Sequence, residues 1–176
     1  MNSLCGSKCK LVPYTKDCVK TYHSWFVKYP ELLEATGSEF LTLAEEYENQ
    51  KSWENDESKL TFLIMCLDPN KYLCGDINAF FSLDEDDPTL TVAELNLMVA
   101  EPSAQRRGIA TEALDLFMQY IGEILFLNKK KIVFIAKIQI TNHASINLFE
   151  KMGFTRFKTV LCFNEAHYRF VGKWGI

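Results

Sequence analysis

The hydrophobic and polar residues of this chain follow two periods, which predict two kinds of element. Apolar residues recur every three to four positions in four segments, as is typical of amphipathic helices: Asp17–Tyr29, Thr42–Trp53, Gly108–Leu125 and Asn142–Gly153. Shorter apolar or alternating segments predict seven strands: Lys10–Pro13, Lys59–Leu67, Tyr72–Phe81, Thr89–Ala100, Lys131–Ile138, Phe154–Phe163 and His167–Val171. The order β-α-α-β-β-β-α-β-α-β-β indicates an α+β protein, with one domain over residues 1–176.

Local signals predict where several helices begin and end. Thr42 and Glu45 have the spacing of a capping box, in which each side chain bonds the backbone N–H of the other residue. Pro30 is expected to close the first helix, because the residue before a proline avoids the helical conformation. Gly153 is expected to end the last helix.

The crossover from Thr89–Ala100 through a helix to Lys131–Ile138 predicts that these two strands are parallel and adjacent. Their nearly continuous apolar character agrees with burial on both faces. Ligands of open α/β sheets bind at the carboxyl ends of such strands. The segment Gln105–Ala110 and the residue Asn142 both come directly after these ends, so the two signals indicate one site.

The segment Gln105-Arg106-Arg107-Gly108-Ile109-Ala110 lies between a predicted strand and a predicted helix. Such a loop can direct several backbone N–H groups at one anion, and the helix N-terminus adds partial positive charge. Gly108 permits close approach of the backbone, and two arginines add charge. The pattern favours a phosphate or pyrophosphate ligand. The alternative is an ordinary strand-to-helix turn with a helix-starting glycine.

Composition narrows the function classes. The 176 residues are 48% hydrophobic and 24% charged, and the net charge of −4 argues against a sequence-independent nucleic-acid binder. The longest central apolar run, Phe62–Leu67, is far shorter than the roughly 20 residues of a membrane span, so no membrane association is expected. Six cysteines without a C-x-x-C pair suit a reducing compartment, the cytoplasm or nucleus. Cys5 and Cys9 lack a second pair of ligands nearby, so no metal is expected.

At the level of whole motifs, the chain resembles the GCN5-related N-acetyltransferase (GNAT) superfamily. Gln105–Ala110 is similar to its Q/R-x-x-G-x-G/A signature, and Asn142–Phe154 is similar to its N-x-x-A/S-x-x-L-x-x-x-x-G-F motif. Gly75-Asp76-Ile77 resembles the start of its third strand. The resemblance implies a three-layer α/β fold: a mixed, mostly antiparallel seven-stranded sheet with a splayed central parallel pair, flanked by about four helices. Leu11–Thr15 resembles the opening of the RimJ-like branch. In combination with Ala93–Leu95 and Met98–Ser103, it resembles the eukaryotic N-acetyltransferase-nine-like proteins.

The same resemblance implies acetyl-CoA as co-substrate and assigns residues to it. Backbone groups of three strand residues would bond the pantetheine arm, the loop would hold the pyrophosphate, and three residues of the second motif would line the arm. The strand residues are Leu97, Met98 and Val99. The pyrophosphate residues are Gln105, Arg106, Arg107, Gly108, Ile109, Ala110 and Thr111. The residues of the second motif are Asn142, Ser145 and Phe149. Asn142 has an alternative or additional role as a helix N-cap.

Catalysis requires a group that takes a proton from the acceptor amine. Strand alternation places four residues on one face, Val92, Glu94, Asn96 and Met98, with Ala93, Leu95, Leu97 and Val99 on the other. Glu94 is the first candidate for general base, the alternative being a solvent-facing or structurally paired glutamate. Glu101 is the second candidate, and Asn96 is a candidate to orient a water. Phe149 stands where the family often has a tyrosine that reprotonates the leaving thiolate, so no general acid is assigned.

The resulting hypothesis is an acetyl-CoA-dependent N-acetyltransferase that acts directly on an amine, with a protein or peptide N-terminus as acceptor. One alternative is acetylation of a small amine or polyamine, weakly favoured by the acidic segment Asp84–Asp87. The other is a non-catalytic regulatory or scaffold protein that binds acetyl-CoA. No nucleic-acid or membrane partner is expected, and the expected state is a monomer or weak dimer.

Overall fold

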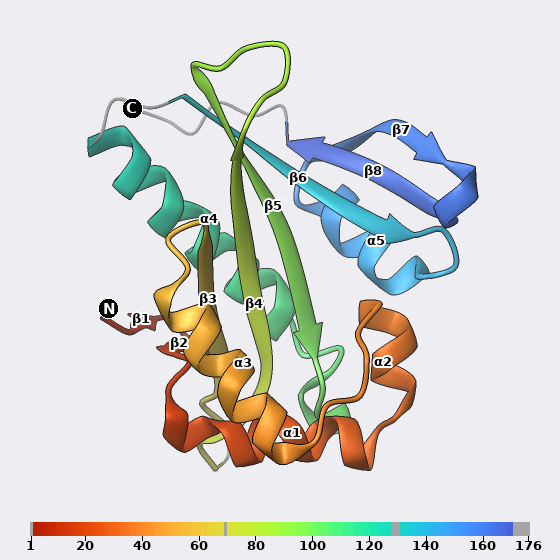
Figure 1. The fold of residues 1–176 in the computed structure, drawn as a ribbon. Coiled ribbons are helices and arrows are strands. Elements are labelled where there is room, and N and C mark those ends of the chain that lie inside the picture. The colour runs from red at the N-terminus through yellow and green to blue at the C-terminus, as the bar shows by residue number, and fades with distance from the viewer. Residues whose placement is uncertain (1, 69, 128–130, 171–176) are drawn as a thin grey trace. The chain divides into compact units, whose positions relative to one another are not determined.

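The computed structural model describes residues 2–68, 70–127 and 131–170, and its contacts divide the chain into two compact units. Unit 1 comprises Met1–Asn78 and Leu97–Leu116, and unit 2 comprises Ala79–Asn96 and Phe117–Ile176. Three elements run through both units (Figure 1): strands β4 (Tyr72–Leu83) and β5 (Leu90–Val99) and helix α4 (Ile109–Leu127). The expectation of one domain over the whole chain stays a prediction.

The described strands hydrogen-bond in the order β1-β2-β3-β4-β5-β6-β8-β7. Besides β4 and β5 they are β1 (Leu4–Cys5), β2 (Cys9–Pro13), β3 (Lys59–Cys66), β6 (Lys131–Gln139), β7 (Phe154–Val160) and β8 (Glu165–Phe170). The pairs β1–β2, β2–β3, β6–β8 and β7–β8 are antiparallel, whereas β5–β6 is parallel. The predicted mixed sheet and its parallel pair are therefore confirmed.

The predicted number of strands was one too low, because β1 was missed. This strand has only two residues, and it exists because Leu4 pairs with Leu11 and Cys5 with Lys10. A two-residue strand has no period of its own. The predicted strand Phe154–Phe163 was also too long: β7 ends at Val160, and Leu161–Phe163 forms a 3-10 turn before Asn164 with φ +54°. The predicted end at Val171 lies outside the described residues.

The helices besides α4 are α1 (Val19–Lys28), α2 (Glu31–Thr36), α3 (Leu43–Asn55) and α5 (His143–Lys151), with 3-10 turns at Lys16–Cys18 and Pro102–Ala104. The expectation of about four helices missed α2. Pro30 does close α1, but it is also the N-cap of α2, where its fixed φ of −60° suits a helix start. Gly37 ends α2 at φ +63°.

The predicted caps are confirmed. The Thr42 side chain accepts a hydrogen bond from the Glu45 backbone N–H, and the Glu45 carboxylate accepts one from the Thr42 backbone N–H at 2.7 Å. Asn142 caps α5, and Gly153 comes after that helix at φ +91°. These predictions succeeded because each involves residues only a few positions apart.

An aromatic cluster forms the core beside α1 and α3, two helices of unit 1 that pack together (Figure 1). The Tyr22 ring lies 5.0 Å from Tyr14, 5.6 Å from Trp25 and 6.3 Å from Trp53, measured between centroids. Aromatic rings bury large areas and favour such tilted contacts. This cluster fixes the two helices that precede β3. No helix of the described chain is long and apolar enough to cross a membrane.

Strand β5 changes its burial period near its carboxyl end. From Thr91 to Asn96 buried and half-buried residues alternate, but Leu97 is half-buried and Met98 is buried. The predicted face shared by Glu94 and Met98 is therefore wrong beyond Asn96, because Met98 turns into the core of unit 1. The parallel pairing of β5 with β6 ends at Glu94 and Ile135, although β5 continues to Val99. This ending agrees with the expected splay of the parallel pair.

Candidate functional site

The loop between β5 and α4 contains two left-handed residues directly before a helix. Arg106 has φ +57° and Gly108 has φ +79°, so two residues of this short loop are left-handed. Helix α4 begins directly after, at Ile109. The first N–H groups of a helix have no partner within it, and they carry the positive end of its dipole. The loop therefore combines backbone donors with a reversed chain path at one point of unit 1.

The long side chains of this loop differ in what they contact. Gln105 Nε2 donates to the Val99 backbone oxygen at 3.0 Å, which ties the loop to the end of β5. The Arg107 guanidinium forms an ion pair with Asp68 at 2.9 Å and donates to the Ser103 backbone oxygen at 3.4 Å. Arg107 therefore holds the loop against the segment after β3. Of the two arginines, the exposed Arg106 is the better candidate for a phosphate.

The backbone at the end of β5 is held by the neighbouring strand. A Cβ atom on Gly75 would collide with the Met98 backbone oxygen, so only glycine fits there. The N–H groups of Ala100 and Glu101 both donate to the Cys74 backbone oxygen, at 2.8 and 3.1 Å. Two donors on one carbonyl are the pattern of a β-bulge, which bends a strand and redirects the residues after it. The bulge thus sets where β5 leaves the sheet for the loop.

Sequence reasoning missed two residues beside this loop, Lys8 and Glu112. Glu112, in the first turn of α4, accepts hydrogen bonds from the backbone N–H groups of Ser7, Lys8 and Cys9 at 2.7–3.0 Å. Burial raises the pKa of Glu112, but these bonds and one from the Ser7 hydroxyl outweigh it and lower the pKa to about 2. The Lys8 ammonium lies against Gly108. No local pattern could have found a contact between residues 104 positions apart.

Unit 2 holds the second motif. Asn142 Oδ1 accepts a hydrogen bond from the Ser145 backbone N–H at 3.1 Å, so the N-cap role is confirmed. Phe149 is buried and packs edge-on against Phe154, with ring centroids 5.0 Å apart and an interplanar angle of 88°. The side chain that stands in place of the family's tyrosine is therefore a core residue of this unit.

The carboxylates proposed for proton transfer have partners. Glu94 forms an ion pair with Lys137 at 2.7 Å within unit 2, as the alternative of a structurally paired glutamate expected. In unit 1, Glu101 accepts a hydrogen bond from the Tyr29 hydroxyl at 3.1 Å, and Lys28 lies at 3.4 Å. Asn96 is half-buried on β5. A carboxylate held by an ammonium must loosen that contact before it accepts a proton from another amine.

Two carboxylates of the acidic turn before β5 accept hydrogen bonds from groups within the turn. Asp84 Oδ1 accepts hydrogen bonds from the N–H groups of Asp86 and Asp87 at 3.0 Å, and Asp87 Oδ1 accepts from the Thr89 hydroxyl at 2.6 Å. These contacts are those of a capped turn. The polyamine alternative that this acidic segment suggested stays a prediction.

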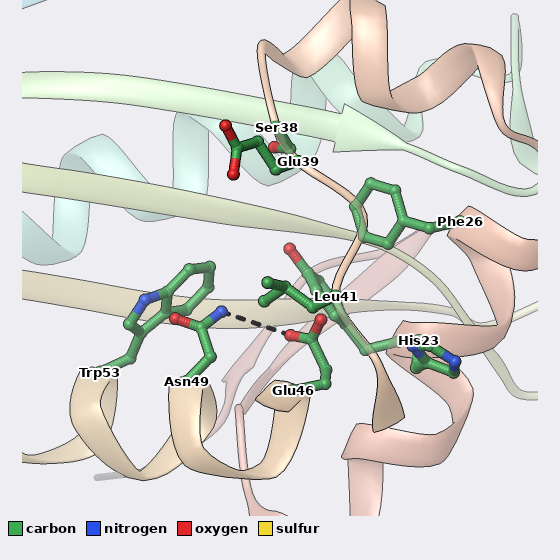
Figure 2. Close-up of a pocket in the computed structure, with 9 residues that line it drawn as sticks. His23, Phe26, Ser38, Glu39, Leu41, Glu46, Asn49 and Trp53 are labelled. Carbon is green, nitrogen blue, oxygen red and sulfur yellow. Dashed lines mark hydrogen bonds between the residues drawn. The ribbon is translucent and has the colours of Figure 1, made fainter. Parts of the chain in front are cut away.

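A small pocket of about 60 Å³ lies between α1, α3 and the segment 38–41 of unit 1 (Figure 2). Glu46 is one of the residues that line this pocket, and it is only 4% exposed. Asn49 Nδ2 and the Tyr14 hydroxyl donate to this carboxylate, both at 3.4 Å, and burial raises its pKa. The pocket has room for a few waters or one small polar group, and is too small for a coenzyme.

The family comparison agrees with the loop and the fold. The sequence profile described as "Acetyltransferase (GNAT) domain" matches residues 9–155, so this chain belongs to the GNAT acetyltransferase family and is an N-acetyltransferase. Among its relatives, an N-acetyltransferase 9-like protein of Nematostella vectensis is 42% identical over 96% of this chain and 85% of that protein. The alpha/beta-tubulin-N-acetyltransferase 9 of Mus musculus is also 42% identical, over 94% of this chain and 69% of that protein.

A solved structure shares the fold at low sequence identity. RimL, the ribosomal L7/L12 alpha-N-protein acetyltransferase, in complex with coenzyme A, has a TM-score of 0.78 at 14% identity. The match covers 96% of this chain and 97% of that one. In this chain, the glycine at φ +79°, the start of α4 and the exposed Arg106 are a donor set that fits a phosphate ligand.

Proposed function

We propose that this chain transfers the acetyl group of acetyl-CoA directly to the α-amine of a protein N-terminus. The proposal is supported by the loop Gln105–Ala110, which has left-handed Arg106 and Gly108 directly before α4 and which we call the anion-binding loop. It is also supported by the name of the mouse relative, which describes acetylation of a protein. RimL is described as an alpha-N-protein acetyltransferase, and the mouse relative is named for α- and β-tubulin. Peptides with tubulin N-terminal sequences are therefore the first acceptors to test.

The motif residues have the following roles in coenzyme binding under this proposal. The backbone N–H groups of Gln105–Thr111, together with Arg106, bind the pyrophosphate. The backbone of Leu97–Val99 bonds the pantetheine arm, with Asn142 as a further partner, and Ser145 and Phe149 line it. Acetyl-CoA itself supplies an activated acetyl thioester.

The proton of the acceptor amine needs a base, because a free α-amine has a pKa of roughly 7.7–8.0 and only its neutral form attacks. Glu94 is the first candidate, and Lys137 holds its carboxylate in place. Glu101 is the second, held by Tyr29. Asn96 orients a water between base and amine. Phe149 has no proton to give, so water protonates the leaving thiolate.

The decisive experiment supplies the purified chain with acetyl-CoA and pairs of tubulin N-terminal peptides. One peptide of each pair has a free N-terminus, and the other has a blocked N-terminus and a free lysine. Release of the CoA thiol and the mass gain of one acetyl group are measured. We expect acetylation of the free N-terminus alone. Gly108→Glu is the negative control, because it places a carboxylate in the anion-binding loop at a left-handed position.

A non-catalytic coenzyme-binding protein is the second candidate, favoured by Phe149, which cannot donate a proton where the family often has a tyrosine. It predicts that CoA binds while no peptide, lysine or polyamine is acetylated. Acetylation of polyamines but not peptides would instead support the small-amine alternative. We further propose a reducing compartment, the cytoplasm or nucleus, which is supported by the free state of all six cysteines.

A further inference from the structure

The ammonium group of Lys8 lies beside Gly108 of the anion-binding loop. It lies in the turn between β1 and β2, and its ammonium nitrogen is 2.7 Å from the position that a Cβ atom on Gly108 would take. Both residues belong to unit 1. Because Gly108 has no side chain and has φ +79°, the Lys8 ammonium can approach the same backbone that the proposed pyrophosphate would approach.

The turn that carries Lys8 is tied to the same helix end. Glu112 accepts hydrogen bonds from the Lys8 N–H at 2.7 Å, the Cys9 N–H at 2.8 Å and the Ser7 hydroxyl at 2.6 Å. Gly6 closes the turn by donating to the Cys9 backbone oxygen at 2.9 Å. The Lys8 backbone is thus fixed relative to the first turn of α4. Only its flexible stem remains to be ordered when an anion binds.

The Lys8 ammonium forms no ion pair with a carboxylate of the described residues, although the ionised Glu112 bonds the Lys8 backbone. A cation at the N-terminal end of a helix is repelled by the helix dipole, and Arg106 adds a like charge to the same loop. A bound phosphate would convert this repulsion into attraction.

We propose that Lys8 binds the pyrophosphate of the coenzyme, with Glu112 as the residue that positions it. The inference rests on the proposed coenzyme binding and adds a contact from the N-terminal hairpin to the loop after β5. Lys8 supplies a mobile point charge, whereas the backbone N–H groups supply fixed donors.

The test measures binding without any acceptor, by calorimetric titration with CoA and with 3′-dephospho-CoA. Lys8→Met keeps the length of the side chain and removes its charge. We expect it to raise the Kd for both ligands roughly 10-fold, the loss of one charged hydrogen bond. Lys20→Met on α1 makes the same change in net charge at an exposed site and should leave Kd within about twofold.

The possible binding results test the role of Lys8, the phosphate group that it contacts and the proposed function separately. A Kd for Lys8→Met equal to that of the wild type would overturn the inference while leaving the proposed function intact. A penalty with CoA that vanishes with 3′-dephospho-CoA would assign Lys8 to the 3′-phosphate and overturn the pyrophosphate assignment. Failure of the wild type to bind CoA would overturn the proposed function and this inference together.

The positioning role of Glu112 is tested by a double-mutant cycle. Glu112→Gln should raise the Kd for CoA in the wild-type background. In the Lys8→Met background it should change Kd by less than about twofold, because the residue it positions is already gone. Additive effects of the two substitutions on Kd would show that Glu112 acts independently of Lys8 and would overturn its positioning role. Circular dichroism of each variant confirms that the comparison is between folded proteins.

Discussion

Asp76 should make the stability of this protein depend on pH, and Asp76→Asn should remove that dependence. Asp76 is only 4% exposed, and Asn78 Nδ2 donates to its carboxylate at 2.5 Å. Burial raises its pKa to about 7, while the Asn78 bond and the Lys59 charge oppose the rise and Glu46 adds to it. Asparagine has nearly the same shape and keeps an oxygen for the Asn78 donor.

The sign of the effect is set by the two pKa values. In the unfolded chain the Asp76 carboxyl ionises near pH 3.8, but in the folded protein it keeps its proton up to about pH 7. The stability it contributes is complete below pH 3.8 and is lost as the pH rises to about 7. Each pKa unit corresponds to about 1.4 kcal/mol, so the loss amounts to about 4 kcal/mol.

Urea unfolding of the wild type and Asp76→Asn, at pH values from about 4 to about 7.5, measures this difference. The free energy of unfolding of the variant should rise relative to the wild type by up to about 4 kcal/mol across this range. Asp86→Asn makes the same change at an exposed position and should match the wild type. Parallel profiles of the wild type and Asp76→Asn would mean that Asp76 is ionised throughout, which would refute the reasoning.

Three further predictions concern the site and its surroundings. Glu94→Gln should leave the Kd for CoA unchanged and lower kcat by roughly 100-fold, as expected for loss of a general base. Gly75→Ala should destabilise the fold by at least about 1–3 kcal/mol in urea unfolding and weaken CoA binding in calorimetry, because the new methyl displaces the Met98 backbone. Cys74, whose pKa burial raises to about 12, should resist a pulse of iodoacetamide that modifies the exposed Cys162, as read by mass spectrometry.

Matched variants make these predictions decisive. Lys137→Met removes the partner of Glu94 and keeps the carboxylate, so it should retain far more activity than Glu94→Gln. If Glu94→Gln has wild-type kcat, Glu94 is not the base. Gly122→Ala adds a methyl group where no atom lies within 4 Å, and it should stabilise α4 by up to about 1 kcal/mol. A Gly75→Ala protein as stable as wild type would contradict the close approach of β4 and β5.

The sequence alone determined the features whose causes lie within a few residues of each other. The Thr42–Glu45 capping box, the Asn142 cap and the glycine at the start of α4 were all predicted from neighbours in the chain. The parallel pair β5–β6 was predicted as well, because a crossover through a helix permits little else. The loop motif also indicated the class of ligand.

The tertiary structure decided everything that depends on distant partners. The period of β5 slips because Met98 turns toward the core of unit 1, β1 exists only because it pairs with β2, and Arg107 bonds Asp68. Lys8 lies beside Gly108 because Glu112 accepts a hydrogen bond from the Lys8 backbone N–H, although the two residues are 104 positions apart in the chain. Periodicity and capping report the conformational preferences of adjacent residues, whereas these contacts depend on the path of the whole chain. The sequence therefore identified the loop that we propose binds an anion, and the fold decided which charged side chains surround it.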